Sequence, residues 1–284
     1  MSGPTGGFLD ALHMERSGLD PASGADVFLL IHGYGASTFS WRSWAPVLER
    51  RGHVIAIDLL GCGQSAMPPD GPYGPVGQAG LVLELLGRLA SEEEIEPGRV
   101  TLVGHSLGGG IALLTALELQ RAGTPAGRLV VLAGAAYPQH MPPFVKIAST
   151  PRLARFLLRA APTRPLARQV LRSIVFDPAV VTDELVDGYA RPLAREGAAG
   201  ALIASARHIQ PPDLPAITER YRSLAVPTLL LWGRHDRVVP AWVGERLARA
   251  LPDARLRVLE RCGHLPQDEG PGASLAALES FLGD

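Results

Sequence analysis

The sequence has very little lysine and no excess of charge of either sign. Lys146 is the only lysine among 27 basic residues, and 28 acidic residues bring the formal net charge to −1. A chain without a basic excess lacks the electrostatic footprint of a protein that binds nucleic acid or an anionic lipid surface. We therefore expect no nucleic-acid partner and no membrane contact.

Long apolar runs and cysteine are also scarce. A membrane span needs about 18–20 consecutive apolar residues, and runs such as 27–31 are far shorter. The first ten residues contain no Lys or Arg, which argues against a secretory signal. Two cysteines in 284 residues do not make a disulfide framework. A cytoplasmic location is expected, although a mature secreted form would have the same composition.

Short apolar runs alternate with segments of helical periodicity. Strands are expected at 27–31, 54–57, 100–103, 129–132, 229–232 and 256–259, and helices at 39–50, 80–89, 107–120, 239–251 and 273–282. This alternation predicts an α/β fold, a mainly parallel sheet with helices on both faces. Binding sites in such sheets lie at the carboxyl ends of the strands.

A proline-rich stretch interrupts the alternation and predicts a helical cap inserted between two strands. The expected core comprises residues 1–137 and 223–284, and the expected cap residues 138–222. Within the cap, residues 144–172 hold seven basic and no acidic residues, interleaved with apolar ones. We favour a solvated basic face with an apolar underside over a lid that meets a lipid surface.

The segment Gly104-His105-Ser106-Leu107-Gly108 lies between an expected strand and an expected helix. It fits G-x-S-x-G, in which small neighbours allow a strained turn that exposes the serine. The following helix N-terminus directs free N–H groups toward a developing anion. A serine that merely caps a glycine-rich helix would not require the preceding strand, so Ser106 is the expected nucleophile.

Two later strand ends supply the partners that a serine nucleophile needs. Asp236 follows one strand within WGRHDRVVP, and His264 follows the next within CGHLP. A carboxylate there can orient the histidine and stabilise its protonated form. Each residue taken alone has a plainer interpretation: Asp236 as an aspartate in a surface turn, and His264 as a solvated histidine in a loop. The order Ser, Asp, His favours Asp236 as acid and His264 as base.

The loop after the first strand, HGYG at 32–35, supplies backbone donors. We expect the N–H groups of Tyr34 and Leu107 to hold a tetrahedral oxyanion. His32 is expected to tie this loop down. Asp58, in DLLGCGQS at 58–65, is expected to form a turn and to have no catalytic role.

Together, HGYG, DLLGCGQS, GHSLGG, WGRHDRVVP and CGHLP resemble the α/β-hydrolase superfamily, in the branch of carboxylesterases, lipases and ring-fission-product hydrolases. The resemblance runs from about residue 26 to the C-terminus. It implies a serine hydrolase that needs no cofactor and no metal. Ring-fission-product hydrolases usually have Asn where His105 stands and Trp where Leu265 stands, so both positions favour an esterase. Dehalogenases and most epoxide hydrolases use an Asp nucleophile, against which Ser106 argues.

The expected substrate is a small-molecule carboxylic ester with a small to medium acyl chain. Phe144, Ile147, Phe156 and Leu157 are expected to line its pocket, because they alternate with arginines that must reach water. Two alternatives stay open: a hydrolase that cleaves a carbon–carbon bond of a ring-fission diketone with the same residues, and a ligand-binding receptor on the same fold. No oligomeric state is predicted.

Overall fold

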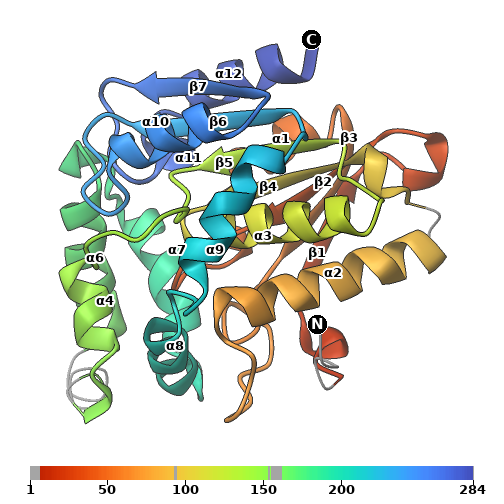
Figure 1. The fold of residues 1–284 in the computed structure, drawn as a ribbon. Coiled ribbons are helices and arrows are strands. Elements are labelled where there is room, and N and C mark those ends of the chain that lie inside the picture. The colour runs from red at the N-terminus through yellow and green to blue at the C-terminus, as the bar shows by residue number, and fades with distance from the viewer. Residues whose placement is uncertain (1–6, 93–94, 153, 155–161, 284) are drawn as a thin grey trace.

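A computed structural model describes residues 7–92, 95–152, 154 and 162–283. Its strands are β1 (Met14–Gly18), β2 (Asp26–Ile31), β3 (Gly52–Ile57), β4 (Val100–His105), β5 (Arg128–Leu132), β6 (Thr228–Gly233) and β7 (Ala254–Leu259). They form one seven-stranded sheet in the order β1-β3-β2-β4-β5-β6-β7. β1 is antiparallel to β3, and the other neighbouring pairs are parallel (Figure 1). The predicted α/β fold with a mainly parallel sheet is confirmed.

Helices cover both faces of the sheet. The helices around it are α1 (Ala45–Leu48), α2 (Pro75–Glu92), α3 (Leu107–Arg121), α10 (Ala241–Ala250), α11 (Pro266–Glu269) and α12 (Pro271–Gly283). Alternate strand residues point to opposite faces. In β2, Leu29 and Ile31 pack in the apolar layer under α2, α3 and α10, whereas Phe28 and Leu30 pack in the layer under α1 and α12. The strands β2 to β6 are therefore buried on both sides, which is why their sequences are nearly continuous apolar runs.

The structure differs from the sequence expectation at two places before β4. The helix expected at 39–50 is instead a 3-10 turn, η3 (Thr38–Trp41), followed by the short α1. Pro46 lacks the N–H that a continuous helix would need there, so the helix starts again at Ala45. The edge strand β1 was not expected, because its mostly exposed residues give no apolar signal.

The remaining 3-10 turns are short and lie in the connections. They are η1 (Leu9–Ala11), η2 (Pro21–Ser23), η4 (Pro97–Arg99), η5 (Pro178–Val180) and η6 (Arg220–Ser223). Cys62 and Cys262 are both free. Among the described residues, no helix is long and apolar enough to pass through a membrane.

The inserted helices lie between β5 and β6. They are α4 (Pro143–Ala148), α6 (Thr163–Ile174), α7 (Asp183–Leu193), α8 (Ala198–Arg207) and α9 (Leu214–Glu219). Of these, α4, α6, α7 and α8 gather on one side of the molecule, at the lower left of Figure 1. The helical cap between two strands is thus confirmed, while its division from the core at residues 138 and 222 stays a prediction.

Part of the basic face of the cap is neutralised within the cap itself. Arg164 pairs with Asp183 at 2.7 Å and with Asp187 at 2.5 Å, and Arg168 also pairs with Asp183. Exposed ion pairs of this kind contribute little to stability. They do neutralise positive charge that a lipid-binding lid would present to an anionic surface. These pairs support the solvated basic face favoured by the sequence.

Candidate active site

Ser106 lies on the tight turn between β4 and α3. Its backbone has a positive φ, with φ 54° and ψ −116°, a strained conformation for a residue with a side chain. The flanking glycines are required by close backbone contacts. A Cβ on Gly104 would lie 2.3 Å from the Gly108 carbonyl oxygen, and one on Gly108 would lie 2.2 Å from the Ile31 carbonyl oxygen. The G-x-S-x-G pattern therefore follows from the packing of this turn.

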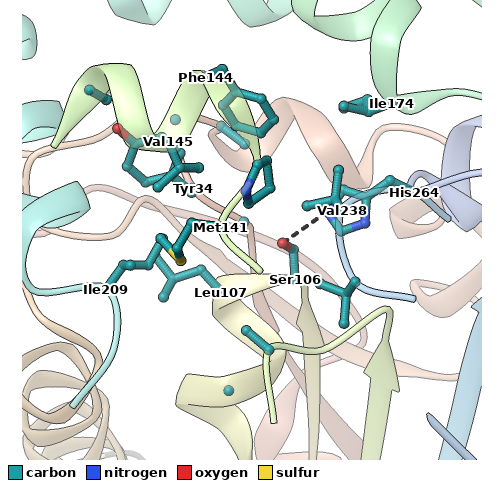
Figure 2. Close-up of a pocket in the computed structure, with 18 of the residues that line it drawn as sticks. Tyr34, Ser106, Leu107, Met141, Phe144, Val145, Ile174, Ile209, Val238 and His264 are labelled. Atoms are coloured by element: carbon teal, nitrogen blue, oxygen red, sulfur yellow. Dashed lines mark hydrogen bonds between the residues drawn. The ribbon is translucent and has the colours of Figure 1, made fainter. Parts of the chain in front are cut away.

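The structure brings Ser106, His264 and Asp236 together in one hydrogen-bonded chain. Ser106 Oγ lies 2.9 Å from His264 Nε2, and His264 Nδ1 lies 2.8 Å from Asp236 Oδ2. The first of these contacts is the dashed line in Figure 2. A carboxylate only accepts, so Nδ1–H is the donor to Asp236. Nε2 is then the lone-pair atom that can accept the proton of Ser106. All three residues are buried.

The Asp236 carboxylate is oriented by its own loop. Its Oδ1 accepts hydrogen bonds from the N–H groups of Val238, at 2.7 Å, and Val239, at 2.9 Å. Its other oxygen is left for His264. Both carboxylate oxygens are therefore hydrogen-bonded. The loop holds the Asp236 carboxylate in place, and the carboxylate determines which nitrogen of His264 carries the proton.

Tyr34 and Leu107 lie on the two segments that flank Ser106. A Cβ on Gly33 would lie 3.1 Å from the Ser106 Cβ, so the loop at 32–35 packs directly on the serine. In the described part of the chain, no acceptor is bonded to the backbone N–H of Tyr34 or of Leu107. Two free N–H groups beside a nucleophile suit an oxyanion hole. The Tyr34 side chain points away to the cap, where its hydroxyl donates to the Leu202 carbonyl at 3.0 Å.

His32 and Asp58 are placed as structural residues. His32 Nδ1–H donates to the Gly33 carbonyl at 2.7 Å, and its Nε2 accepts from the Leu59 N–H at 3.0 Å. Burial lowers the pKa of His32, which favours this neutral form. Asp58 accepts from the N–H groups of Thr38, at 2.8 Å, and Gln64, at 2.7 Å. Both side chains tie loops together at the strand ends.

Comparison with known proteins agrees with this architecture. Residues 28–278 match the Alpha/beta hydrolase family. The chain belongs to this family. The match spans the sheet from β2 onward, the cap and all the residues described above, so the molecule is a hydrolase of the α/β-hydrolase fold.

Individual relatives cover most of the chain. The hydrolase is 30% identical to the uncharacterized hydrolase YugF of Bacillus subtilis, over 91% of this chain and 90% of the relative. It is also 30% identical to a 2-hydroxy-6-oxo-2,4-heptadienoate hydrolase of Pseudomonas putida, over 89% and 88%. Among solved structures, the meta-cleavage product hydrolase CumD of Pseudomonas fluorescens IP01 has a TM-score of 0.77 and 25% identity, over 96% and 94%.

A cavity of about 260 Å³ lies beside Ser106 and beneath the cap. Figure 2 shows Phe144 and Val145 of α4, Met141 and Ile209 on the side of the cap, and Val238 beside His264. Phe144 and Ile147, two of the residues expected at the substrate pocket, lie on the wall of this cavity. The other two predicted lining residues, Phe156 and Leu157, lie outside the described residues. Among the described lining residues there is no Lys, Arg, Asp or Glu.

The contact between His105 and His264 is one that no pattern in the sequence indicates. His105 Nε2–H donates to the His264 backbone carbonyl at 2.8 Å, and the two rings lie 4.9 Å apart. Burial, and then the charge that His264 can carry, lower the pKa of His105 to about 3. His105 is therefore neutral while it supports the histidine that bonds to Ser106.

This low pKa predicts how stability depends on pH. Between the ordinary value of 6.5 and about 3, the unfolded chain binds a proton at His105 and the folded chain does not. Lowering the pH through this window should therefore destabilise the fold by up to about 1.4 kcal/mol per pH unit from this residue. In His105→Asn that contribution disappears, whereas the one from His32 remains.

Urea unfolding at pH 7, 6, 5 and 4 would measure the effect. The free energy of unfolding should fall less steeply with decreasing pH in His105→Asn than in the wild type. Parallel curves for the two proteins would contradict the low pKa of His105.

Proposed function

We propose that this hydrolase cleaves uncharged carboxylic esters of small to medium acyl chain, with Ser106 as nucleophile, His264 as base and Asp236 as acid. As Ser106 Oγ attacks the ester carbonyl carbon, its proton passes to His264 Nε2. The N–H groups of Tyr34 and Leu107 stabilise the oxyanion that forms. Asp236 stabilises the positive charge that His264 acquires.

Collapse of the tetrahedral intermediate breaks the bond to the alkoxide oxygen. His264 gives its proton to that oxygen, so the alcohol leaves and an acyl group remains on Ser106. A water molecule then attacks the acyl carbon, with His264 again taking the proton. The acid product leaves, and Ser106 Oγ recovers its proton.

The uncharged cavity lining is the observation that carries the ester proposal. A carboxylate bound there would be removed from water without a cationic partner among the described lining residues, which is costly. Neutral esters avoid this cost and place apolar groups against residues such as Phe144 and Val145. A carbonyl beside Ser106 would then be the main polar group of the bound molecule.

A second candidate is hydrolysis of a carbon–carbon bond in a ring-fission diketone. The named relatives favour it over the ester, since they are hydrolases of a 2-hydroxy-6-oxo-dienoate and of a meta-cleavage product. The same nucleophile and base can act on a ketone carbonyl. Against it stand the absence of charged side chains among the described lining residues and the residues His105 and Leu265, where the resemblance to ring-fission-product hydrolases implies Asn and Trp.

A graded panel of p-nitrophenyl esters tests the ester proposal. We expect kcat/KM to rise about 4-fold per methylene, since each buried methylene contributes about 0.8 kcal/mol. It should then fall once the cavity is full. Phe144→Ala should move the optimum to longer chains. Leu19→Ala, which shortens an exposed side chain outside the cavity, is the matched control and should leave the optimum unchanged.

The same enzyme preparation should be given a 2-hydroxy-6-oxo-dienoate, whose cleavage is followed by loss of its absorbance. A higher kcat/KM on this diketone than on every ester would establish the second candidate instead. Stabilisation by these compounds without turnover of any of them would indicate a receptor.

A further inference from the structure

One carboxylate holds the backbone on both sides of His264. Glu269, the last residue of α11, accepts a hydrogen bond from the Gly263 N–H at its Oε2 and one from the Leu265 N–H at its Oε1, each at 2.9 Å. Gly263 and Leu265 are the residues immediately before and after His264. The position of the His264 backbone is therefore tied to the position of Glu269.

The same carboxylate also holds a segment of the cap. Its Oε2 accepts a third hydrogen bond, from the Phe176 N–H at 2.6 Å, just beyond the end of α6. His264 N–H in turn donates to the Ile174 carbonyl at 2.9 Å. The His264 loop and the cap segment 174–176 are thus joined directly, by one hydrogen bond, and through Glu269, by three.

Close packing of the two backbones explains Gly263. A Cβ there would lie 2.5 Å from the Ile174 carbonyl oxygen and 2.7 Å from the Phe176 nitrogen. Its φ is not among the positive values of the described glycines, so no left-handed turn requires it. Glycine is needed because the cap backbone approaches at this point.

A carboxylate suits this position because it accepts and never donates. Its two oxygens offer about four lone-pair sites for the three N–H groups, and bonds to a charged acceptor are stronger than neutral ones. An amide of the same shape would keep one acceptor oxygen and would turn an NH₂ group toward the other donors. The Phe176 ring gives the cap segment a second contact, stacked on His235 at 4.5 Å between centroids.

We propose that Glu269 is a positioning residue for His264, and that through it the cap segment 174–176 sets the alignment of the imidazole with Ser106. The proposal rests on the proposed role of His264 as base. Catalytic hydrogen bonds tolerate little displacement, and a shift of about 1 Å can reduce a rate about 100-fold. Loss of the carboxylate should therefore affect the rate more than substrate binding.

Glu269→Gln is the test, and Glu260→Gln is its matched control. Glu260 is an exposed carboxylate whose partner is Arg234, at 2.9 Å. In Glu269→Gln we expect kcat and the rate of organophosphonate labelling of Ser106 to fall at least about 10-fold, with KM changed less than about 3-fold. Amide hydrogen exchange at Gly263 and Leu265 should become faster. The control should match the wild type in all three measurements.

Two substitutions of Phe176 measure the contribution of the cap segment to the alignment of His264. Phe176→Ala and Phe176→Pro both remove the ring, but only proline removes the N–H. Val175 already has φ −84° and ψ 158°, an extended conformation that suits a residue before proline. The proline variant should lose at least about 3-fold more kcat than the alanine variant, and this difference should vanish when Glu269 is also replaced by Ala.

The possible outcomes separate this proposal from the proposed function. Wild-type kcat and labelling in a folded Glu269→Gln protein would overturn the positioning role of Glu269. Equal kcat in the two Phe176 variants would overturn the part assigned to the cap segment. A wild-type enzyme that is not labelled at Ser106 would overturn the proposed function instead. Hydrogen exchange would in that case still report whether Glu269 holds the His264 loop.

Discussion

Replacing Ser106 with alanine is expected to lower kcat by about 10⁶-fold, because the members of a catalytic triad act as a unit. Covalent labelling by an organophosphonate should disappear, since no Oγ remains to attack the phosphorus. The side chain of His264 would stay held by Asp236 at 2.8 Å. Steady-state kinetics and mass spectrometry of the labelled protein measure both effects.

The control for this variant is its fold. Alanine carries the same Cβ as serine, so the strained backbone at φ 54° is neither relieved nor worsened. The melting temperature should therefore stay close to that of the wild type. Labelling that persists in the folded variant would show that another residue is the nucleophile.

Asp236→Asn is expected to lower kcat by about 10⁴-fold. The asparagine oxygen would remain the acceptor for the N–H groups of Val238 and Val239. Its NH₂ group would then face His264 Nδ1, which must become the acceptor. The proton of the imidazole moves to Nε2, and this atom can no longer take the proton of Ser106. Rates measured at saturating substrate test this expectation.

Asp58→Asn is the matched control for the acid. Asp58 is also a buried carboxylate at a strand end, but its partners are the N–H groups of Thr38 and Gln64. The substitution should cost about 1–3 kcal/mol of stability and leave kcat within a few-fold of the wild type. The opposite pattern, an inactive Asp58→Asn and an active Asp236→Asn, would reverse the two assignments.

The parts of the site that sequence analysis could predict are those fixed by strand ends. A buried parallel strand is recognisable as an apolar run, and its carboxyl end must lie on one edge of the sheet. Ser106 and Asp236 each follow such a run, and His264 follows the partly exposed strand β7. All three lie at carboxyl ends of parallel strands, so their proximity follows from the fold class. The glycines at 104 and 108 also predicted the tight turn that carries Ser106.

Other features depend on contacts that leave no periodic signal. β1 is an exposed edge strand without an apolar face. Glu269 acts on backbone N–H groups, which every residue except proline carries, so nothing in the sequence marks its partners. His105 reaches the His264 carbonyl across two strand ends that are distant in the chain. The expected lining residues Phe156 and Leu157 lie outside the described part of the structure, so their placement stays a prediction.

The insertion of the cap between β5 and β6 separates two kinds of information along the chain. Ser106 precedes the insertion, and Asp236 and His264 follow it, so the three proposed catalytic residues are encoded outside the stretch that roofs the cavity. The cap can therefore be exchanged or lengthened during evolution, which changes the substrate, while the proposed catalytic residues stay the same. The backbone contacts of Ile174 and Phe176 set a limit on that freedom, because a replacement cap must still present a carbonyl and an N–H at the same two points.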